Sequence, residues 1–388
     1  MIALRRSASL GPRFSRSRFL RAAGTLVRCL LIGLVGGPAS SVDANDIAAG
    51  IYVRTDTDGT TVVTPSASAE VGIIDDRTAV NIGYAADIWT SASIDIRTAA
   101  TRRITEQRDE LTAGVTRELG DVDISGSYRF SHEGDYVSHG GALRASFELG
   151  EGSSTIDAAA LLAIDTVSRA GDDAFRREVG TVGARLGYTQ IIDPETIVAG
   201  TLEITRREGY QASPYRFVGV GGDGQCGGSA MLCLPETHPN ERIRTAAVVR
   251  GRRAFGEQWS AGLAYRFYID DWSLASHTAI GQASFVPVDG STLTLRYRFY
   301  IQSAASFYER RYAMPTGRLQ FVTRDRELSP MNTHRLVLSF ERAFDLTAAG
   351  PEARLTLALG GAVLNYSDFD GLDTILALDA TVGMVLTL

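Results

Sequence analysis

Apolar and polar residues alternate along residues 291–302, whose sequence is STLTLRYRFYIQ. Leu293, Leu295, Tyr297, Phe299 and Ile301 share one parity, and polar or charged side chains dominate the other. Successive side chains of a β-strand point to opposite faces, so this segment has one apolar and one polar face. In a soluble sheet the apolar face meets a core, whereas in a membrane barrel it meets lipid and the polar face lines the lumen.

The same alternation recurs along almost the whole chain after Ala44 and predicts sixteen strands. They are residues 47–55, 60–74, 78–90, 107–118, 121–132, 136–149, 154–166, 176–191, 196–207, 240–254, 258–270, 273–286, 291–302, 331–344, 352–364 and 373–388. Many of them are long enough for a tilted membrane crossing of about 9–11 residues, whereas soluble strands favour about 5–6.

The connections between these strands alternate between two kinds. One set consists of compact turns rich in Gly, Pro, Asp and Glu: 75–77, 119–120, 149–153, 193–195, 255–258, 287–290 and 345–351. The other set is mostly longer: 91–106, 167–175, 208–239 and 303–330, with smaller members at 56–59, 133–135, 271–272 and 367–372. Outer-membrane barrels have short periplasmic turns and longer outer loops, whereas a Greek-key sandwich gives no reason for such sorting. The sequence therefore predicts an all-β fold, a transmembrane up-and-down antiparallel β-barrel of about 16 strands in the cell outer membrane.

Residues 1–44 have the pattern of a cleavable signal peptide. Seven arginines precede a short apolar core at 30–37, and Val42-Asp43-Ala44 is a plausible cleavage site. A disordered basic tail is the alternative. The sequence has no run of about 18 apolar residues that would form a transmembrane helix, so residues 45–388 are assigned to the barrel.

The charge of the predicted mature chain bears on its partners. Residues 45–388 hold 32 arginines, no lysine and 44 acidic residues, a net charge of −12. This balance argues against nucleic acid as a partner. The expected partners are outer-membrane lipid, lipopolysaccharide and the barrel assembly machinery, and the oligomeric state stays open.

Several collinear segments resemble a family of predicted outer-membrane β-barrel proteins of Gram-negative bacteria that has no assigned function. They are SASIDIRTAATRRITEQRDE at 91–110, DYVSHGG at 135–141, QASPYRFV at 211–218, ETHPNERIR at 236–244, YIDDWSLASHT at 268–278, RYRFYIQSAASFY at 296–308 and RDRELSP at 324–330. The resemblance implies the same fold and location and supplies no activity. One departure is the C-terminus, which ends Thr387-Leu388 instead of in the aromatic residue common among outer-membrane barrels.

Cys226 and Cys233 are the only cysteines after residue 44 and lie in the longest predicted outer loop. In an oxidising envelope, two cysteines at this separation favour a local disulfide that stiffens a Gly-rich loop. Together with His238 they could instead bind a metal ion.

The five histidines all lie at predicted outer strand ends or in adjoining loops, where acidic residues also gather. A metal or acid/base site at the outer mouth is one hypothesis. Parity argues against it, because His132, His139 and His334 share the outward parity, while His277 is ambiguous. The sequence lacks GxSxG, HExxH, P-loop and paired CxxC motifs, so we expect no enzyme and no cofactor. An outer-membrane hydrolase using Ser138, His139 and Asp135 is a lesser alternative.

Arg266, Asp270, Arg296 and Arg298 are the candidate lumen-lining residues. A mixed-charge lining that braces neighbouring strands is one interpretation, and an arginine ladder that attracts anions is the other. The function that fits best is a pore for small solutes, in which the loop 303–330 folds inward as a constriction. The alternative is a scaffold barrel whose outer loops recognise a partner.

Overall fold

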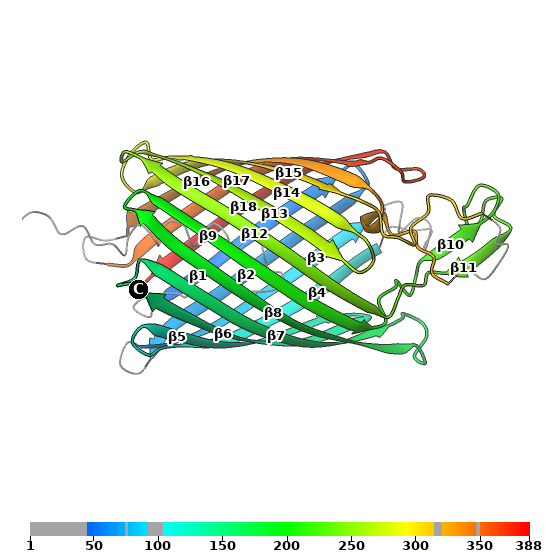
Figure 1. Ribbon diagram of the computed structural model, residues 1–388, viewed down its shortest axis with the longest axis horizontal. Helices are drawn as coiled ribbons and strands as arrows, with labels where there is room; N and C mark the ends of the chain where they lie inside the picture. The colour runs from blue at the N-terminus through cyan, green and yellow to red at the C-terminus, as the bar shows by residue number, and fades with distance from the viewer. Residues whose placement is uncertain (1–44, 74–76, 92–103, 314–319, 347–349) are drawn as a thin grey trace, which may run out of the picture. The chain divides into compact units, whose positions relative to one another are not determined.

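The computed structural model describes residues 45–73, 77–91, 104–313, 320–346 and 350–388 (Figure 1). The predicted signal peptide lies outside the described residues, so it stays a prediction. No helix in the described part of the chain is long and apolar enough to cross a membrane.

Sixteen antiparallel strands close into a barrel in which each strand pairs with its neighbours in sequence (Figure 1). They are β1 (Asp46–Asp56), β2 (Thr60–Ile73), β3 (Thr78–Ser91), β4 (Ile104–Glu118), β5 (Val122–Glu133), β6 (Tyr136–Leu149), β7 (Ser154–Ser168), β8 (Arg176–Asp193), β9 (Thr196–Gly209), β12 (Glu241–Phe255), β13 (Trp259–Asp270), β14 (Ala275–Phe285), β15 (Ser291–Gln302), β16 (Met331–Asp345), β17 (Glu352–Tyr366) and β18 (Thr374–Thr387). Pairing of β1 with β18, from Asp46↔Thr387 to Asp56↔Ala377, closes the sheet. The predicted fold class and strand count are confirmed.

The barrel has its apolar side chains on the outside. In β15, Leu295 and Tyr297 are 47% and 44% exposed, whereas the inward Thr294 is 3% exposed. Small polar residues occupy equivalent inward positions on several strands: Ser131, Ser138, Ser146, Ser276, Ser284, Thr333 and Ser339. Such an apolar outer band requires lipid around it, so the structure is that of an outer-membrane β-barrel.

A separate hairpin, β10 (Phe217–Val220) and β11 (Leu232–Pro235), lies in the outer connection 210–240, beyond the strand ends (Figure 1). The sequence predicted a loop without strands for this connection, and that prediction was wrong in this detail. Each strand has only four residues, too few to give a clear alternation.

The described part of loop 303–330 runs outward to this hairpin (Figure 1). Val220 pairs with Tyr312, and Thr237 pairs with Val322. Val218 completes a buried cluster with Val220, Tyr312 and Val322. The predicted inward constriction is therefore wrong for these residues, because the loop buries its apolar side chains against another loop. Both ends of the loop lie at the barrel mouth, where Ala305 and Leu328, the last residue of the short 3₁₀ helix η1 (Arg326–Leu328), pack with Trp272.

Candidate functional site

The inward faces of the barrel carry different charges on different sides. Strands β2 to β7 present the carboxylates of Glu70, Asp87, Glu106, Glu110, Asp123, Glu133, Asp157 and Asp165. Strands β12 to β17 present the guanidinium groups of Arg242, Arg244, Arg250, Arg252, Arg266, Arg296, Arg298, Arg335 and Arg354. All of these side chains face the lumen, because they occupy positions that alternate with the outward apolar ones.

Arginines on the acidic side are paired with carboxylates. Arg129 donates to Glu110 at 3.0 Å, and Arg144 donates through Nε to Asp157 at 3.0 Å. Arg108 pairs with Asp87 in the same way. These are cross-strand ion pairs that brace the wall, as the mixed-charge interpretation anticipates.

Three of the four predicted lumen residues are arginines on the other side, and neutral partners hold two of them. Arg296 donates from Nε and Nη2 to Oε1 of Gln282 at 3.1 and 2.8 Å, and Arg298 stacks over the ring of Tyr300 at 5.3 Å. Arg266 stacks over Tyr268 at 5.3 Å and lies 4.0 Å from a carboxylate oxygen of Glu203. The charge of these arginines is thus only weakly balanced.

Asp270, the fourth predicted residue, has a different environment. Its carboxylate accepts from Nη2 and Nε of Arg242 at 2.5 and 2.8 Å and from the Tyr268 hydroxyl at 2.8 Å. It also accepts from the amide of Leu274 at 3.0 Å, which fixes the turn into β14. The Asp270 side chain is fully buried, so it anchors the outer rim and is closed to solutes.

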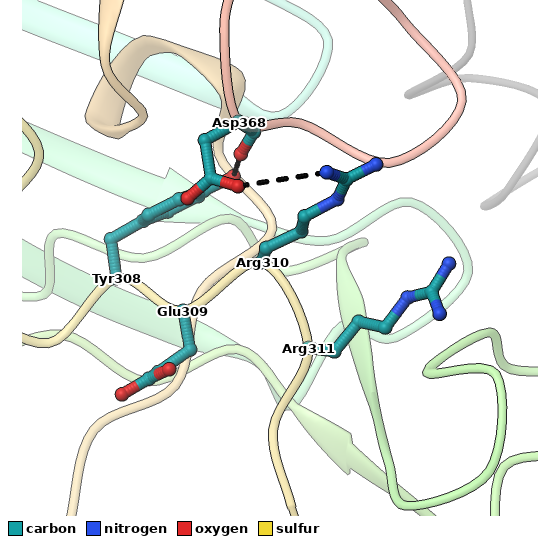
Figure 2. A pocket seen from close by; sticks show the side chains of 5 residues that line it. All are labelled: Tyr308, Glu309, Arg310, Arg311 and Asp368. Atoms are coloured by element: carbon teal, nitrogen blue, oxygen red, sulfur yellow. Dashed lines mark hydrogen bonds and ion pairs between the residues drawn. The ribbon is translucent and has the colours of Figure 1, made fainter.

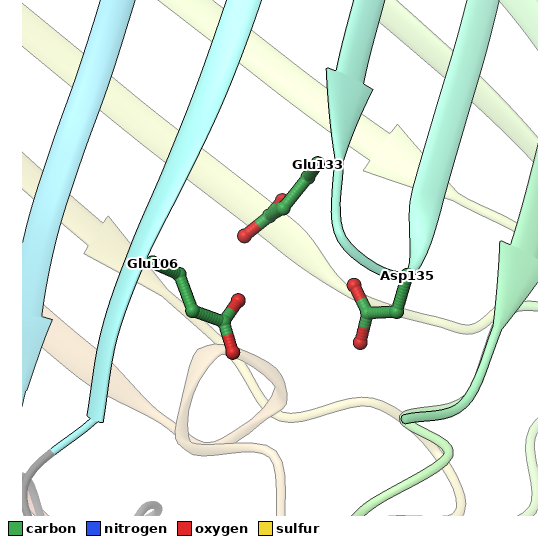
Figure 3. Close-up of side chains that lie close together, drawn as sticks. All are labelled: Glu106, Glu133 and Asp135. Carbon is green, nitrogen blue, oxygen red and sulfur yellow. The ribbon is translucent and has the colours of Figure 1, made fainter. Parts of the chain in front are cut away.

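Three carboxylates converge at the outer end of β4 and β5 (Figure 3). Glu106, Glu133 and Asp135 each have one oxygen within 4.8 Å of the others, and Trp89 donates to Glu133 at 3.3 Å. The metal-site hypothesis requires histidines to join such acids, and strand parity argued against it. The structure does not bring them here, because the histidines of the neighbouring strands point outward.

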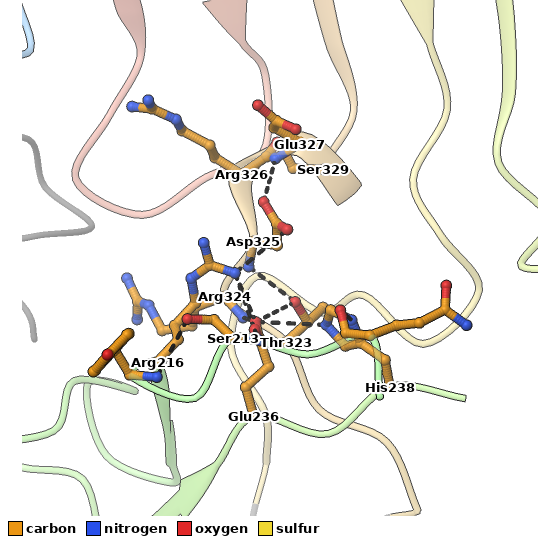
Figure 4. Close-up of polar contacts among 12 residues, drawn as sticks. Ser213, Arg216, Glu236, His238, Thr323, Arg324, Asp325, Arg326, Glu327 and Ser329 are labelled. Atoms are coloured by element: carbon orange, nitrogen blue, oxygen red, sulfur yellow. Dashed lines mark hydrogen bonds and ion pairs between the residues drawn. The ribbon is translucent and has the colours of Figure 1, made fainter. Parts of the chain in front are cut away.

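A second cluster ties loop 210–240 to loop 303–330 around the carboxylate of Glu236 (Figure 4). Its side chain is fully buried and accepts from the Thr323 hydroxyl at 2.7 Å and from the amides of Ser213 and Arg324 at 3.0 and 3.1 Å. Arg216 adds an ion pair at 3.0 Å. Burial by itself raises the pKa of Glu236, but nearby His238, Arg216 and the amide donors outweigh it and lower the pKa to about 2. Glu236 is therefore ionised and connects the two loops through hydrogen bonds and an ion pair.

His238 and the cysteines do not form the alternative metal set. Cys226 and Cys233 form a disulfide with their Cα atoms 5.7 Å apart. His238 instead packs edge-on against Trp272, with ring centroids 5.4 Å apart, and its Nε2 lies 3.6 Å from Glu236. Through this packing against Trp272, His238 connects loop 210–240 to the barrel mouth.

Arg310 and Arg311 share one carboxylate above the β17–β18 hairpin. Arg310 donates to Asp370 at 2.6 Å, and Arg311 contacts the other oxygen. Arg310 also faces Asp368, 3.8 Å away, at the edge of an open pocket that Tyr308 and Glu309 complete (Figure 2). Partial burial raises the pKa of Asp370, but the two guanidinium groups outweigh it and hold the pKa below its usual range. These contacts link loop 303–330 to a third outer connection.

The triad of Ser138, His139 and Asp135 is not assembled. Ser138 faces inward and donates to Asp165 at 2.6 Å, whereas His139 is exposed on the outer face. Adjacent residues of one strand point to opposite faces, which is why this sequence neighbourhood forms no catalytic group.

The histidines of three strand pairs have hydrogen-bond partners that were not predicted from the sequence. Each accepts or donates a hydrogen bond at Nδ1 with a tyrosine hydroxyl of the neighbouring strand: Tyr128–His139 at 2.7 Å, Tyr265–His277 at 2.6 Å and Tyr297–His334 at 2.7 Å. The repeated Tyr-Arg-Phe triplets at 128–130, 265–267 and 297–299 were the available signal. His277, which was ambiguous, thus points outward.

The model of a family described as "Protein of unknown function (DUF3570)" matches residues 98–349. No curated protein matches the sequence. Among solved structures, the chain is similar to a bacterial polysaccharide outer membrane secretin at 8% identity and a TM-score of 0.51, over 90% of this chain and 100% of that one. It is also similar to CdiB from Acinetobacter baumannii, at 8% identity and a TM-score of 0.48 over 90% of this chain, and it spans only 61% of CdiB. OprD from Pseudomonas aeruginosa gives 8% identity and a TM-score of 0.46, over 89% of this chain and 96% of that one. At these identities the likeness concerns the outer-membrane barrel fold alone.

Proposed function

We propose that this chain, which belongs to the family described as "Protein of unknown function (DUF3570)", is a pore for small solutes across the outer membrane. The observation that carries the proposal is a closed sixteen-strand barrel whose inward faces carry many polar and charged side chains. Barrels of 16–18 strands enclose an aqueous channel in porins, whereas eight strands leave an interior that side chains fill. A water-filled lumen also accounts for inward arginines that lack a close carboxylate, since water solvates them.

The test is single-channel recording of the refolded protein in a planar bilayer. Heat-modifiable gel mobility first establishes that the preparation contains folded barrel. Stable conductance steps in KCl that grow with salt concentration support the proposal. A folded preparation that inserts into the bilayer without conductance contradicts it.

A second candidate function is a barrel whose outer loops recognise a partner. It is supported by the fixed conformation of those loops. The Glu236 cluster and the cluster around Val218 and Tyr312 give loops 210–240 and 303–330 a fixed relative arrangement. A preorganised surface lowers the entropic cost of binding a partner. Folded protein that shows no conductance in the bilayer favours this function. Binding experiments would then use the outer-loop surface to capture a partner.

A further inference from the structure

We propose that the pore prefers anionic solutes that carry carboxylate or phosphate groups, and that an arginine cluster on one side of the lumen selects them. The arginine cluster consists of Arg252, Arg266, Arg296, Arg298 and Arg335. This inference rests on the proposed function, because a lumen that conducts nothing selects nothing.

Strand register brings the members of the arginine cluster together. Arg298 of β15 is the direct partner of Arg335 of β16. Arg296 lies in one lateral row with Gln282 of β14, Gly262 of β13 and Arg252 of β12, through successive register pairs. The intervening Gly262 has no side chain to fill the space between Arg252 and Arg296. The guanidinium group of Arg296 lies within electrostatic range of Arg252.

The positive charges of the arginine cluster act on one another. Arg296 lies within electrostatic range of Arg335 and Arg252, and Arg298 lies within range of Arg335 and Arg266. Like charges at this spacing repel, so the fold places them together at a cost. An anion between them removes that repulsion, which makes the arginine cluster a natural binding position for negative charge.

Acidic side chains neutralise the arginine cluster only in part. Among the described residues, the carboxylates that pair with it are Asp379, 2.8 Å from Arg335, and Glu203, 4.0 Å from Arg266. Arg252 donates to the Ser260 hydroxyl at 2.8 Å, and Arg296 donates to Gln282. Neutral acceptors leave the net charge unchanged. Each guanidinium has five N–H donors, so donors are left for a carboxylate or phosphate.

The opposite side of the lumen strengthens the asymmetry. In the sheet order, β4 is eight strands away from β14 around a sixteen-strand barrel, so the two face each other across the lumen. The β4 side carries Glu106 with Glu133 of the adjacent β5, whereas β14 is flanked by Arg266 and Arg298. A field across the lumen therefore draws anions towards the arginine cluster and cations away from it.

The experiment measures the reversal potential of the folded, reconstituted protein in a KCl gradient. The wild type is expected to be anion-selective. The double variant Arg296→Gln/Arg298→Gln is expected to lower the chloride-to-potassium permeability ratio by roughly threefold or more. The charge-conserving variant Arg296→Lys/Arg298→Lys should keep most of the preference.

Arg253→Gln is the matched control. Arg253 is the sequence neighbour of Arg252, but it occupies the outward parity of β12 and pairs with Glu195 at 3.3 Å. Its removal changes the net charge without changing the lumen, so selectivity should stay as in the wild type.

The outcomes separate the inference from the function on which it rests. If the wild type conducts without anion preference, or if the double variant keeps that preference, the arginine cluster is not the selector. The proposal of a pore is unaffected by either result. Equal losses in Arg253→Gln and the double variant also overturn the arginine cluster as selector, because net charge would then be the cause. Folded protein without conductance overturns the pore itself, and the inference with it.

Discussion

The hydroxyl of Tyr297 lies 2.7 Å from Nδ1 of His334 on the outward face of the barrel, near the outer ends of β15 and β16. The ring of Phe299 holds the same imidazole from the side, with centroids 5.0 Å apart. Because Phe299 and His334 are direct register partners, the tyrosine reaches the histidine diagonally, two residues along the strand. The arrangement combines an apolar ring surface with a polar edge, which suits the boundary between lipid tails and headgroups.

The first prediction concerns this pair. Tyr297→Phe keeps the aromatic ring and removes the hydrogen bond, and it should lower the free energy of unfolding by about 0.5–1.5 kcal/mol. The measurement is urea-induced unfolding of the barrel in lipid vesicles. A double-mutant cycle with His334→Gln isolates the pair, and a coupling energy of zero would show that the contact adds no stability.

A second prediction follows from the low pKa of Glu236. An ordinary glutamate titrates near 4.5, whereas Glu236 in the folded loops titrates near 2. Because its pKa is lower in the folded state, the carboxylate stabilises the loop cluster fully above pH 4.5, and this contribution is lost as the pH falls towards 2. The contribution is roughly 3 kcal/mol for a shift of this size.

Hydrogen exchange at the amides of Ser213 and Arg324, which donate to Glu236, measures this effect. After correction for intrinsic rates, their protection should hold from pH 7 to about 5 and decline below it. In Glu236→Gln the protection should be low at every pH. Glu195→Gln, an exposed glutamate paired with Arg253, is the control and should change neither amide. Wild-type protection that does not vary between pH 5 and 3 would contradict the assignment.

The third prediction concerns the disulfide of Cys226 and Cys233. It closes a loop rich in glycine, and Cys233 is the register partner of Gly219 in the β10–β11 hairpin. Replacing both cysteines with serine should free the intervening segment, and subtilisin should cut there about tenfold faster than in the wild type. Heat-modifiable mobility of the barrel should stay the same, because no barrel strand contains either cysteine. Equal cleavage rates would mean that the loop contacts suffice without the bond.

The strands were predictable from sequence because lipid outside and water in the lumen require apolar and polar residues at alternate positions along each membrane crossing. Leu295, Tyr297 and Thr294 obey that rule regardless of their neighbours. Pairing within the lumen was harder to predict. Whether Arg298 meets a carboxylate or another arginine depends on the register between β15 and β16, and the pattern of a single strand does not contain it.

The outer mouth was the least predictable region. Asp270 has the parity of a lumen residue, yet it is buried, because Arg242 and the turn into β14 surround it at the rim. The hairpin β10–β11 depends on Tyr312, nearly a hundred residues further along the chain, for its packing. Contacts between distant loops leave no periodicity in the sequence, so only the three-dimensional structure shows them.

The last prediction tests the contact between the two long loops. The Tyr312 hydroxyl donates to the carbonyl of Phe307 at 2.8 Å and accepts from the amide of Thr323 at 2.9 Å, and the residue is 5% exposed. Tyr312→Phe keeps the ring in its apolar cluster but leaves the buried Thr323 amide without this acceptor, at a cost of about 1–3 kcal/mol. Hydrogen exchange at Thr323 should therefore accelerate roughly tenfold or more.

The control for this variant is Tyr188→Phe, an outward tyrosine of β8 whose hydroxyl contacts Gln190, and it should leave the Thr323 amide unchanged. The predicted acceleration should also reach the amide of Thr237, because Thr237 and Val322 exchange backbone hydrogen bonds at 3.0 Å. If Thr323 accelerates while Thr237 does not, the two loops open separately. If neither amide responds, the Tyr312 hydroxyl contributes nothing to the joint between them, and the apolar cluster with Val218 and Val220 holds the loops on its own.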